Sequence, residues 1–452
     1  MGSVRTRIGG TRRRPGVLAT VAALGSAGLL MVSCSNASKP VAAPASSATV
    51  PTPSPTAAPT ASSSPPSTAP STAPSTAPST APSTAPSTAA PTSATSATTT
   101  SATASSKPPA TSPDALSGFT AQQLAGQRVV YSYQGLTPPA SLLQLIRAGQ
   151  VAGVIFFAGN VSSSAQIAGV VGQLRQAQQQ SSVQLPLLLM TDQEGGVVRR
   201  LPGGPAKSAK QVGQSSDPSS AASQAGAQAA ATLAGDGMNL NLAPVLDVFR
   251  QPGDFIDGTQ RSFSSDPNVV SSLGRNYIVA QQSAGVAATA KHFPGLGSAP
   301  AGSNTDLQPV TLTVSLADLR STDEVPYKGA IAGGVKLVML SWAVYPALDA
   351  NHPAGMSSTV VDQELRGRQG FSGVTITDAL EAGALNAYGG PGQRAAAAAG
   401  AGMDLLLCSS GDVNQGETAS ASLAAALSQG QLSRSGFEAA VARIRTLRGS
   451  LK

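Results

Sequence analysis

The chain has 452 residues, of which 41% are hydrophobic and 11% are charged, and its formal net charge is +7. The first 33 residues supply five arginines and no acid, and Lys39 and Lys107 supply two more positive charges. From Asp114 onward, 22 basic residues balance 22 acidic ones. A neutral folded part has no electrostatic attraction for a polyanion, so nucleic acid is excluded as the expected partner.

Residues 1–33 have the pattern of a bacterial export signal. The basic run Arg12–Arg14 precedes an apolar stretch from Val17 to Leu30, and Ser33 then stands directly before Cys34. A basic region, a short apolar region and a small residue at the cleavage point are typical of signal peptides. The pattern predicts a lipoprotein signal with Cys34 as the lipid anchor; an ordinary signal peptide with an incidental cysteine is the alternative. The arginine run leaves twin-arginine export open beside the general route.

Residues 34–113 are almost entirely Ser, Thr, Ala and Pro, with a Ser-Thr-Ala-Pro repeat from Ser67 to Pro86. Such a composition cannot bury a core, so we expect a disordered tether. Fully extended at about 3.1 Å per residue, it would reach on the order of 200 Å, enough to carry an enzyme from a membrane into a cell wall. Cys408, the only other cysteine, is expected to be a buried and unreactive thiol.

The pattern of residue types changes at Asp114. From there, short apolar runs alternate with amphipathic segments such as 141–149, 164–180, 269–283 and 316–333. Apolar strands alternating with helices indicate a parallel sheet covered on both faces. Eight such units within residues 114–452 predict a single (β/α)₈ TIM-barrel domain. A doubly wound open sheet is the alternative, but no Gly-x-Gly-x-x-Gly turn follows the first run. The eight runs are 127–133, 151–157, 185–191, 239–248, 286–292, 335–342, 373–378 and 402–408.

Charged side chains lie at the carboxyl ends of several of these runs, where a TIM barrel carries its active site. They are costly at the ends of apolar strands unless they are paired or used. We therefore predict one site at the mouth of the barrel. Trp342, the only tryptophan, either lines this site or packs in the core. The fourth run leads into Asp247, and the candidates are Asp192, Arg199 or Arg200, Arg261, Lys291, His292 and Asp378.

The motifs of several enzyme classes are missing from the sequence. There is no His-Glu-x-x-His or Cys-x-x-Cys pattern for a metal, no phosphate-binding Gly-x-x-x-x-Gly-Lys loop and no Gly-x-Ser-x-Gly elbow. We expect no metal and no cofactor. Carboxylates among cations suit a polyhydroxylated substrate, and a strand-end carboxylate can attack an anomeric carbon if a second group protonates the leaving oxygen.

Four motifs occur in the order of a known family: Asp192-Gln-Glu-Gly-Gly-Val-Val-Arg-Arg-Leu201, Arg261-Ser-Phe, Lys291-His-Phe-Pro-Gly-Leu-Gly297 and Thr377-Asp378. Together they resemble glycoside hydrolase family 3, of the single-domain bacterial β-N-acetylhexosaminidase type, over about residues 115–450. The resemblance implies a retaining hydrolase that releases N-acetylglucosamine from cell-wall or muropeptide fragments through a covalent glycosyl-aspartate. It implies Asp378 as the nucleophile and a sugar-binding set of Asp192, Arg200, Arg261, Lys291 and His292.

The sequence departs from this family at the acid/base position. The family's loop after the fifth strand carries Asp-Ser-His, whereas the same spacing here falls on Gly302-Ser303-Asn304, and an asparagine cannot exchange a proton near pH 7. Asp306 is the nearest carboxylate and is the acid/base that we predict. His352, in the loop after the sixth strand, is the alternative, because histidine is the residue type whose ordinary pKa lies nearest neutral pH.

Three functions remain open at this point. The first is an active hexosaminidase with Asp306 as its acid/base. The second is a glycosidase with weak acid/base help, which would favour activated leaving groups or phosphate as acceptor, since such help is worth about 10²–10⁴-fold. The third is a non-catalytic cell-wall sugar-binding lipoprotein, against which the presence of Asp378 argues. We expect a monomer, anchored at the outer face of the cytoplasmic membrane, with a saccharide as its partner.

Overall fold

The computed structural model describes Leu116 and residues 118–451. The predicted signal peptide, the anchor Cys34 and the tether lie outside the described residues. Among the described helices, none is both long and apolar enough to span a membrane.

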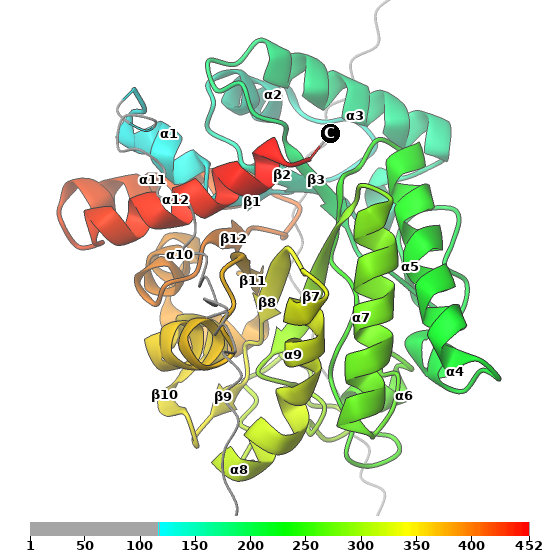
Figure 1. Cartoon of the computed structure of the whole chain (residues 1–452). Coiled ribbons are helices and arrows are strands. Elements are labelled where there is room, and N and C mark those ends of the chain that lie inside the picture. The colour runs from blue at the N-terminus through cyan, green and yellow to red at the C-terminus, as the bar shows by residue number, and fades with distance from the viewer. Residues whose placement is uncertain (1–115, 117, 452) are drawn as a thin grey trace, which may run out of the picture. The chain divides into compact units, whose positions relative to one another are not determined.

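The central element is a closed barrel of eight parallel strands (Figure 1). Six of the strands fall inside one of the apolar runs of the sequence, and β7 and β11 each extend one residue beyond theirs, so the predicted TIM barrel is confirmed. Around the barrel the order is β1-β12-β11-β8-β7-β6-β3-β2, and β1 closes it by pairing with both β12 and β2. The strands are β1 (Val129–Tyr131), β2 (Gly153–Ile155), β3 (Leu188–Thr191), β6 (Leu240–Asn241), β7 (Ala287–Phe293), β8 (Leu337–Leu340), β11 (Val374–Ala379) and β12 (Leu405–Leu407).

Neighbouring residues of a strand point to two different hydrophobic cores. In β3, Leu188 and Met190 belong to a smaller cluster with side chains from the other strands, whereas Leu189 belongs to the larger cluster that includes the helices. This period of two is what a barrel requires, with one set of side chains filling the interior and the other packing under the helices. Because both faces are buried, the strands are apolar throughout.

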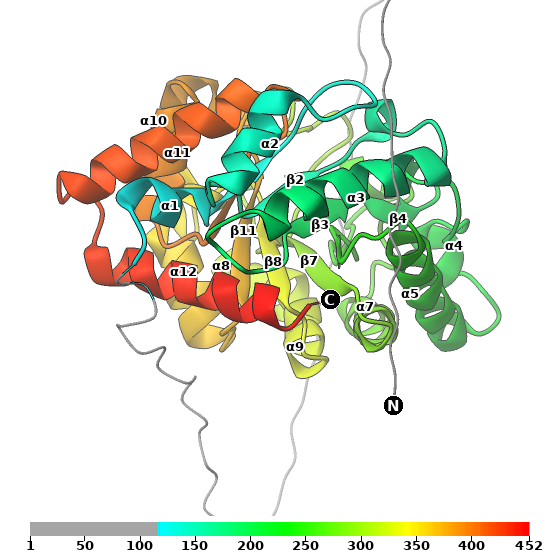
Figure 2. The same cartoon turned by 90° about the horizontal axis from the view of Figure 1, so that it is seen from above.

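Within the described residues, nine α-helices of six or more residues surround the barrel (Figure 2). Several begin at a side-chain cap: Asp266 accepts from the backbone N–H of Asn268, and Pro267 occupies the first turn, where its missing N–H costs nothing. The helices are α1 (Ala121–Gly126), α2 (Ala140–Arg147), α3 (Ser164–Gln179), α5 (Pro218–Gly235), α7 (Pro267–Ser283), α9 (Val325–Ala332), α10 (Pro391–Gly400), α11 (Val413–Ser428) and α12 (Arg434–Gly449).

The segment 316–333, which the sequence presents as one amphipathic helix, is divided into three parts. A short α8 (Leu316–Asp318) leads into a π-helical turn, η3 (Leu319–Asp323), and α9 begins at Val325. Pro326 stands in the first turn of α9, where proline starts a helix but cannot continue one that comes before it. The break lies at Asp323, which is fully buried and packs against Gly295, two residues beyond the end of β7.

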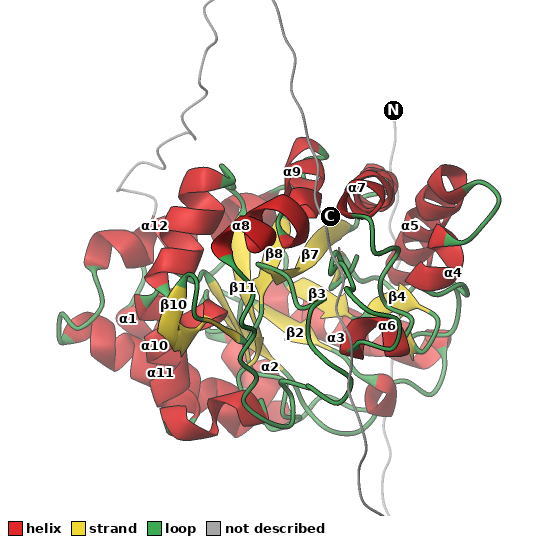
Figure 3. Cartoon of the chain, turned by 90° about the horizontal axis from the view of Figure 1, so that it is seen from below, coloured by secondary structure: helices red, strands yellow, loops and turns green. Residues whose placement is uncertain are grey.

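Short elements gather at one end of the barrel, after the carboxyl ends of its strands (Figures 1 and 3). Two are hairpins, β4 (Gln193–Gly195) with β5 (Val198–Arg199) and β9 (Val344–Tyr345) with β10 (Asp349–Pro353). The others are α4 (Ala209–Gly213), α6 (Phe255–Gly258), η2 (Ala158–Asn160), η4 (Ala354–Met356) and η6 (Gly383–Tyr388), while the π-helical η5 (Thr359–Arg368) follows η4 in the chain. Cys408, just beyond β12, is fully buried, and burial raises the pKa of its thiol, as expected for an unreactive cysteine.

Candidate active site

A pocket of about 290 Å³ opens at this end of the barrel. Its walls come from the ends of several strands and from the loops that follow them, which is the arrangement of an active site in a TIM barrel. Its polar lining consists of Asp192, Glu194, Arg200, Arg261, Lys291, His292, Asn304, Thr305, Asp306, Asp378, Glu381 and Ser409.

The hairpin after β3 brings three of these side chains to the pocket. Asp192 follows the last residue of β3, Glu194 lies in β4 and Arg200 follows β5. The turn needs glycine: Gly195 has a φ of +110°, and a Cβ there would lie 2.2 Å from the backbone oxygen of Lys207. The buried Nε atom of Arg200 has no hydrogen-bond partner within the described protein, and Arg200 lines the pocket.

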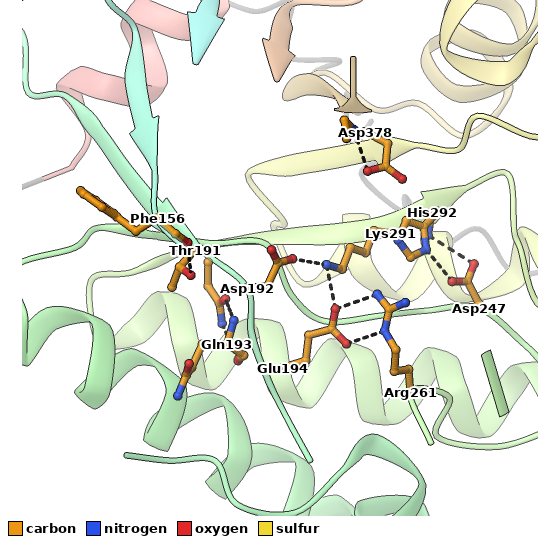
Figure 4. A network of polar contacts seen from close by, with 12 residues as sticks. Phe156, Thr191, Asp192, Gln193, Glu194, Asp247, Arg261, Lys291, His292 and Asp378 are labelled. Carbon is orange, nitrogen blue, oxygen red and sulfur yellow. Dashed lines mark hydrogen bonds and ion pairs between the residues drawn. The ribbon is translucent and has the colours of Figure 1, made fainter. Parts of the chain in front are cut away.

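Glu194 joins two cations on one wall of the pocket (Figure 4). Arg261 donates to both of its carboxylate oxygens, from Nε and Nη2, at 2.8 Å each. Lys291 Nζ lies 2.8 Å from Glu194 Oε1 and donates to Asp192 Oδ1 at 2.7 Å. Two acidic residues thus balance two basic ones. We call these four residues, Asp192, Glu194, Arg261 and Lys291, the ion-pair wall.

The charges of the ion-pair wall fix each other's protonation. Burial by itself raises the pKa of the Glu194 carboxyl, but Arg261 and Lys291 together outweigh burial and hold that pKa well below its usual range. Burial lowers the pKa of Lys291, and the carboxylates of Asp192 and Glu194 reverse that shift, so its pKa is raised. Glu194 and Lys291 are therefore both charged at neutral pH.

His292 is held from behind by Asp247. Asp247 is fully buried; its Oδ2 lies 2.7 Å from His292 Nδ1, and its Oδ1 accepts from the backbone N–H of Leu296 at 2.7 Å. An ionised carboxylate only accepts hydrogen bonds, so Nδ1 carries a proton. His292 lines the pocket, so its other ring nitrogen, Nε2, is free to form a hydrogen bond with a ligand there.

Asp378 lies at the end of β11, and Figure 4 shows its carboxylate directed toward Lys291 and His292. Its Oδ1 accepts from the backbone N–H of Ala379 at 2.8 Å. Trp342 is buried in the core, and its indole N–H donates to the backbone oxygen of Ala379 at 2.8 Å. The tryptophan therefore supports the strand end that carries Asp378 and does not line the pocket.

The loop after β7 brings Asp306 to the same pocket. Asp306 is exposed as a residue, yet its side chain lines the pocket. Partial burial there raises the pKa of its carboxyl, and the charge of Asp378 adds to the rise, while His292 and Arg261 oppose it. Asn304, which stands where a histidine is expected, accepts from the backbone N–H of Asp306 at 2.9 Å and so shapes the turn that presents this residue.

A comparison with known proteins identifies the family of the chain. A sequence profile described as the N-terminal domain of glycosyl hydrolase family 3 matches residues 122–447. The chain belongs to glycosyl hydrolase family 3. The expected family and the expectation of a glycoside hydrolase are thereby confirmed.

Relatives of this family-3 enzyme include fungal and bacterial proteins. An uncharacterized secreted glycosyl hydrolase of Arthroderma benhamiae is 49% identical over 72% of this chain and 93% of that protein. Beta-hexosaminidase A of Pseudoalteromonas piscicida is 33% identical over 70% of this chain, which spans only 56% of that relative's length.

Solved structures of the family share the fold. A beta-N-acetylhexosaminidase from Beutenbergia cavernae is 31% identical, with a TM-score of 0.67 over 73% of this chain and 99% of that one. A family 3 beta-N-acetylglucosaminidase from Paenibacillus sp. is 34% identical, with a TM-score of 0.69 over 74% of this chain and 62% of that one.

The structure of this family-3 hydrolase brings all seven predicted site residues together at one pocket; they are Asp192, Arg200, Arg261, Lys291, His292, Asp306 and Asp378. His352 is not among the lining residues. It lies in β10, pairs with Asp349 at 3.1 Å and borders a separate surface hollow, so the alternative that it reaches the barrel mouth is not supported.

Sequence reasoning missed the roles of two acids at this pocket. Glu194 stands inside the first motif, and its value as a partner for two cations was not visible without the fold. Glu381, three residues after Asp378, lines the pocket and accepts from the hydroxyl of Ser409 at 2.5 Å and from Gln415 at 2.9 Å. An acid so close to Asp378 in the sequence was the available signal.

Proposed function

We propose that this glycoside hydrolase is a retaining β-N-acetylglucosaminidase acting on cell-wall or muropeptide fragments. The observation that carries the proposal is that two carboxyls from different elements, Asp378 and Asp306, line one pocket with a sugar-sized volume. The N-acetyl preference is supported by the relatives described as hexosaminidases and N-acetylglucosaminidases.

The two carboxyls divide the reaction between them. The Asp378 carboxylate attacks the anomeric carbon, and the bond to the leaving oxygen breaks as that oxygen takes a proton from Asp306. Water then attacks the same carbon, gives its proton to the ionised Asp306 and releases Asp378. The raised pKa of Asp306 supports this role, because a general acid must hold its proton when substrate binds.

The remaining lining residues are assigned to the sugar. Asp192 accepts from sugar hydroxyls, while Arg200 and Lys291 donate to sugar oxygens. His292, oriented by Asp247, offers Nε2 to the bound sugar. Arg261 is engaged with both oxygens of Glu194, so we assign it mainly to holding the ion-pair wall, with its remaining N–H groups free for the substrate.

A substrate panel tests the activity. We expect release of 4-nitrophenol from the β-N-acetylglucosaminide and much less from the β-glucoside, with no increase when phosphate is added. Asp378→Ala should reduce the release to background. Full activity in that variant would overturn the assignment, and binding of muropeptides without turnover of any substrate would favour the non-catalytic alternative.

The acid/base assignment has its own test, with Glu381 as the competing carboxyl. Asp306→Asn should slow hydrolysis of a poor leaving group, such as that of chitobiose, by about 10²–10⁴-fold while an activated aryl glycoside reacts nearly normally. Glu381→Gln should show no such selectivity, because Ser409 and Gln415 already occupy its oxygens. The opposite pattern would assign the proton to Glu381.

We also propose that the enzyme is exported and held by a lipid on Cys34. The support is the signal pattern of residues 1–34 and one relative described as secreted. In the full chain, Cys34→Ser should move the enzyme from the detergent phase to the aqueous phase without changing its specific activity. An unchanged distribution would rule out the anchor and leave an ordinary signal peptide.

A further inference from the structure

The loop that carries Asp306 is bound to the segment that follows Asp378 by the backbone alone. The N–H of Gly383 donates to the backbone oxygen of Asp306 at 2.8 Å, and the N–H of Ala384 donates to that of Thr305 at 3.0 Å. These donors belong to the first turn of η6, where backbone N–H groups have no partner within the helix. We call this pair of hydrogen bonds the loop clamp.

The loop clamp leaves no space for a side chain at residue 383. A Cβ at Gly383 would lie 2.2 Å from the backbone oxygen of Leu307, 2.4 Å from its carbonyl carbon and 3.0 Å from the backbone nitrogen of Gln308. These are backbone atoms and cannot rotate away as the end of a flexible side chain can. Any larger residue at this position must therefore push the loop outward.

The loop is also ordered within itself and at its far end. Asn304 accepts from the backbone N–H groups of Leu307 and Gln308 at 3.1 Å each through its own carbonyl, in addition to holding Asp306 through its side chain. Farther along the chain, Leu312 donates to the backbone oxygen of Val344 at 2.9 Å. The turn between Asn304 and Gln308 thus moves as a unit, and the clamp sets its position.

The other side of the clamp is firmly attached to the strand that carries Asp378. Only four residues separate Asp378 from Gly383. Leu380 donates to the backbone oxygen of Leu407 in the neighbouring strand at 3.0 Å, and Ala382 donates to that of Ala379 at 3.1 Å. Backbone hydrogen bonds therefore connect the two carboxyls by a short and continuous path.

We propose that Gly383 is a positioning residue that sets the placement of Asp306 relative to Asp378 by letting the two backbones approach this closely. The inference rests on the proposed role of Asp306 as the acid/base. In this enzyme the acid is held in place before substrate binds, and the asparagine at position 304 serves that placement.

Gly383→Ala is the direct test, with Gly159→Ala as its matched control. Gly159 lies in η2, a loop after another strand of the same barrel, and a Cβ there meets no atom within 4 Å. Because a displacement of about 1 Å in a reacting group costs about 10²-fold, Gly383→Ala should lower kcat for a poor leaving group by that factor. Hydrolysis of the activated aryl glycoside should change little in either variant.

A second pair of variants approaches the clamp from the loop side and adds no atom to the interface. Asn304→Ala removes the acceptor for the Asp306 N–H and should give the same leaving-group selectivity, with a smaller loss. Asn304→Ser restores a short acceptor and should recover part of the rate. This pair decides the question if Gly383→Ala does not fold.

The outcomes separate the two proposals. If Asp306→Asn is selective for the leaving group but Gly383→Ala matches Gly159→Ala, the clamp is not a positioning device. An equal loss on both substrates in Gly383→Ala would mean a merely structural role and would also overturn it. If Asp306→Asn is itself unchanged, the acid/base assignment fails first. Support requires that Gly383→Ala cause no further loss when added to Asp306→Asn.

Discussion

The two sides of the pocket are held by different kinds of interaction. On the ion-pair wall, buried side chains fix one another through charge, as Lys291 does with Asp192 and Glu194. On the loop that carries Asp306, backbone hydrogen bonds fix the position and the side chains are largely exposed. The structure of the ion-pair wall therefore depends on which side chains are present, whereas the position of the Asp306 loop depends mainly on the course of the backbone. An asparagine can therefore stand at position 304 without dismantling the site.

Among the variants that test this comparison, the largest effect is expected where the ion-pair wall is broken at its centre. Glu194→Gln leaves Arg261 and Lys291 close together with one carboxylate fewer between them. Removing one partner of a buried pair costs about 3–5 kcal/mol. We expect kcat/KM to fall by on the order of 10²–10³-fold, together with a loss of unfolding free energy, as measured by steady-state kinetics and chemical denaturation.

The control for that variant is Glu438→Gln, which removes the partner of an exposed pair with Arg434 on α12. Exposed pairs contribute about 0–1 kcal/mol, so activity and stability should stay near those of the unaltered enzyme. Near-normal activity in Glu194→Gln would show that the wall is not what orders this side of the pocket.

A second prediction concerns Asp323, a buried acid that pairs with Arg250. Asp323 is fully buried, and burial raises the pKa of its carboxyl from 3.8 to about 7, although Arg250 and its hydrogen bond pull the other way. Between about pH 4 and pH 7 the unfolded chain releases this proton while the folded protein keeps it. The free energy of unfolding should therefore fall as pH rises through that window, by on the order of 4 kcal/mol.

Denaturation curves between pH 4 and pH 8 measure this dependence. Asp323→Asn should flatten it over the window, whatever the variant does to the overall level of stability. Asp217→Asn, which alters an exposed carboxyl at the cap of α5, should leave the slope as it is. A slope that survives in Asp323→Asn would mean that another group releases the proton.

The third prediction concerns the hydrogen bond between Asp247 and His292, whose direction can be reversed while a side chain of the same size is kept. In Asp247→Asn, the new amide N–H₂ can face His292 Nδ1, which must then accept, so the ring proton moves to Nε2. We expect a loss of about 1–3 kcal/mol, or roughly 10–100-fold in kcat/KM, since a buried polar group is left with the wrong partner. Unchanged kinetics would mean that His292 Nε2 does not contact the substrate.

The fold could be predicted from the sequence because a barrel buried on both faces needs eight apolar runs, and each run here matches one strand, two of which extend one residue beyond it. The break before Pro326 is where this reasoning fell short. The amphipathic pattern continues across residues 316–333, but the proline and the buried Asp323 divide the segment. The periodicity of hydrophobic residues alone does not reveal that break in the helix.

The site was predictable where function requires a charged residue at a strand end, as with Asp378 and Lys291. Glu194 was harder to assign, because its role depends on Arg261, 67 residues away along the chain. The loop clamp was not predictable, since its contacts are made by backbone atoms of Gly383 and Ala384 that any sequence contains. Only a glycine with no room for a Cβ marks the place, and the chain has 47 glycines.

The smallest expected effect compares the two histidine–aspartate pairs. His292 and Asp247 are buried and 2.7 Å apart, whereas His352 is half exposed and lies 3.1 Å from Asp349, away from the pocket. An exposed pair contributes about 0–1 kcal/mol, so His352→Ala should leave kcat within about twofold and shift stability only slightly. Rates on poor and activated leaving groups decide the matter. A selective loss on the poor leaving group would make His352 a proton donor after all, and Asp306 would then have to share or yield that role.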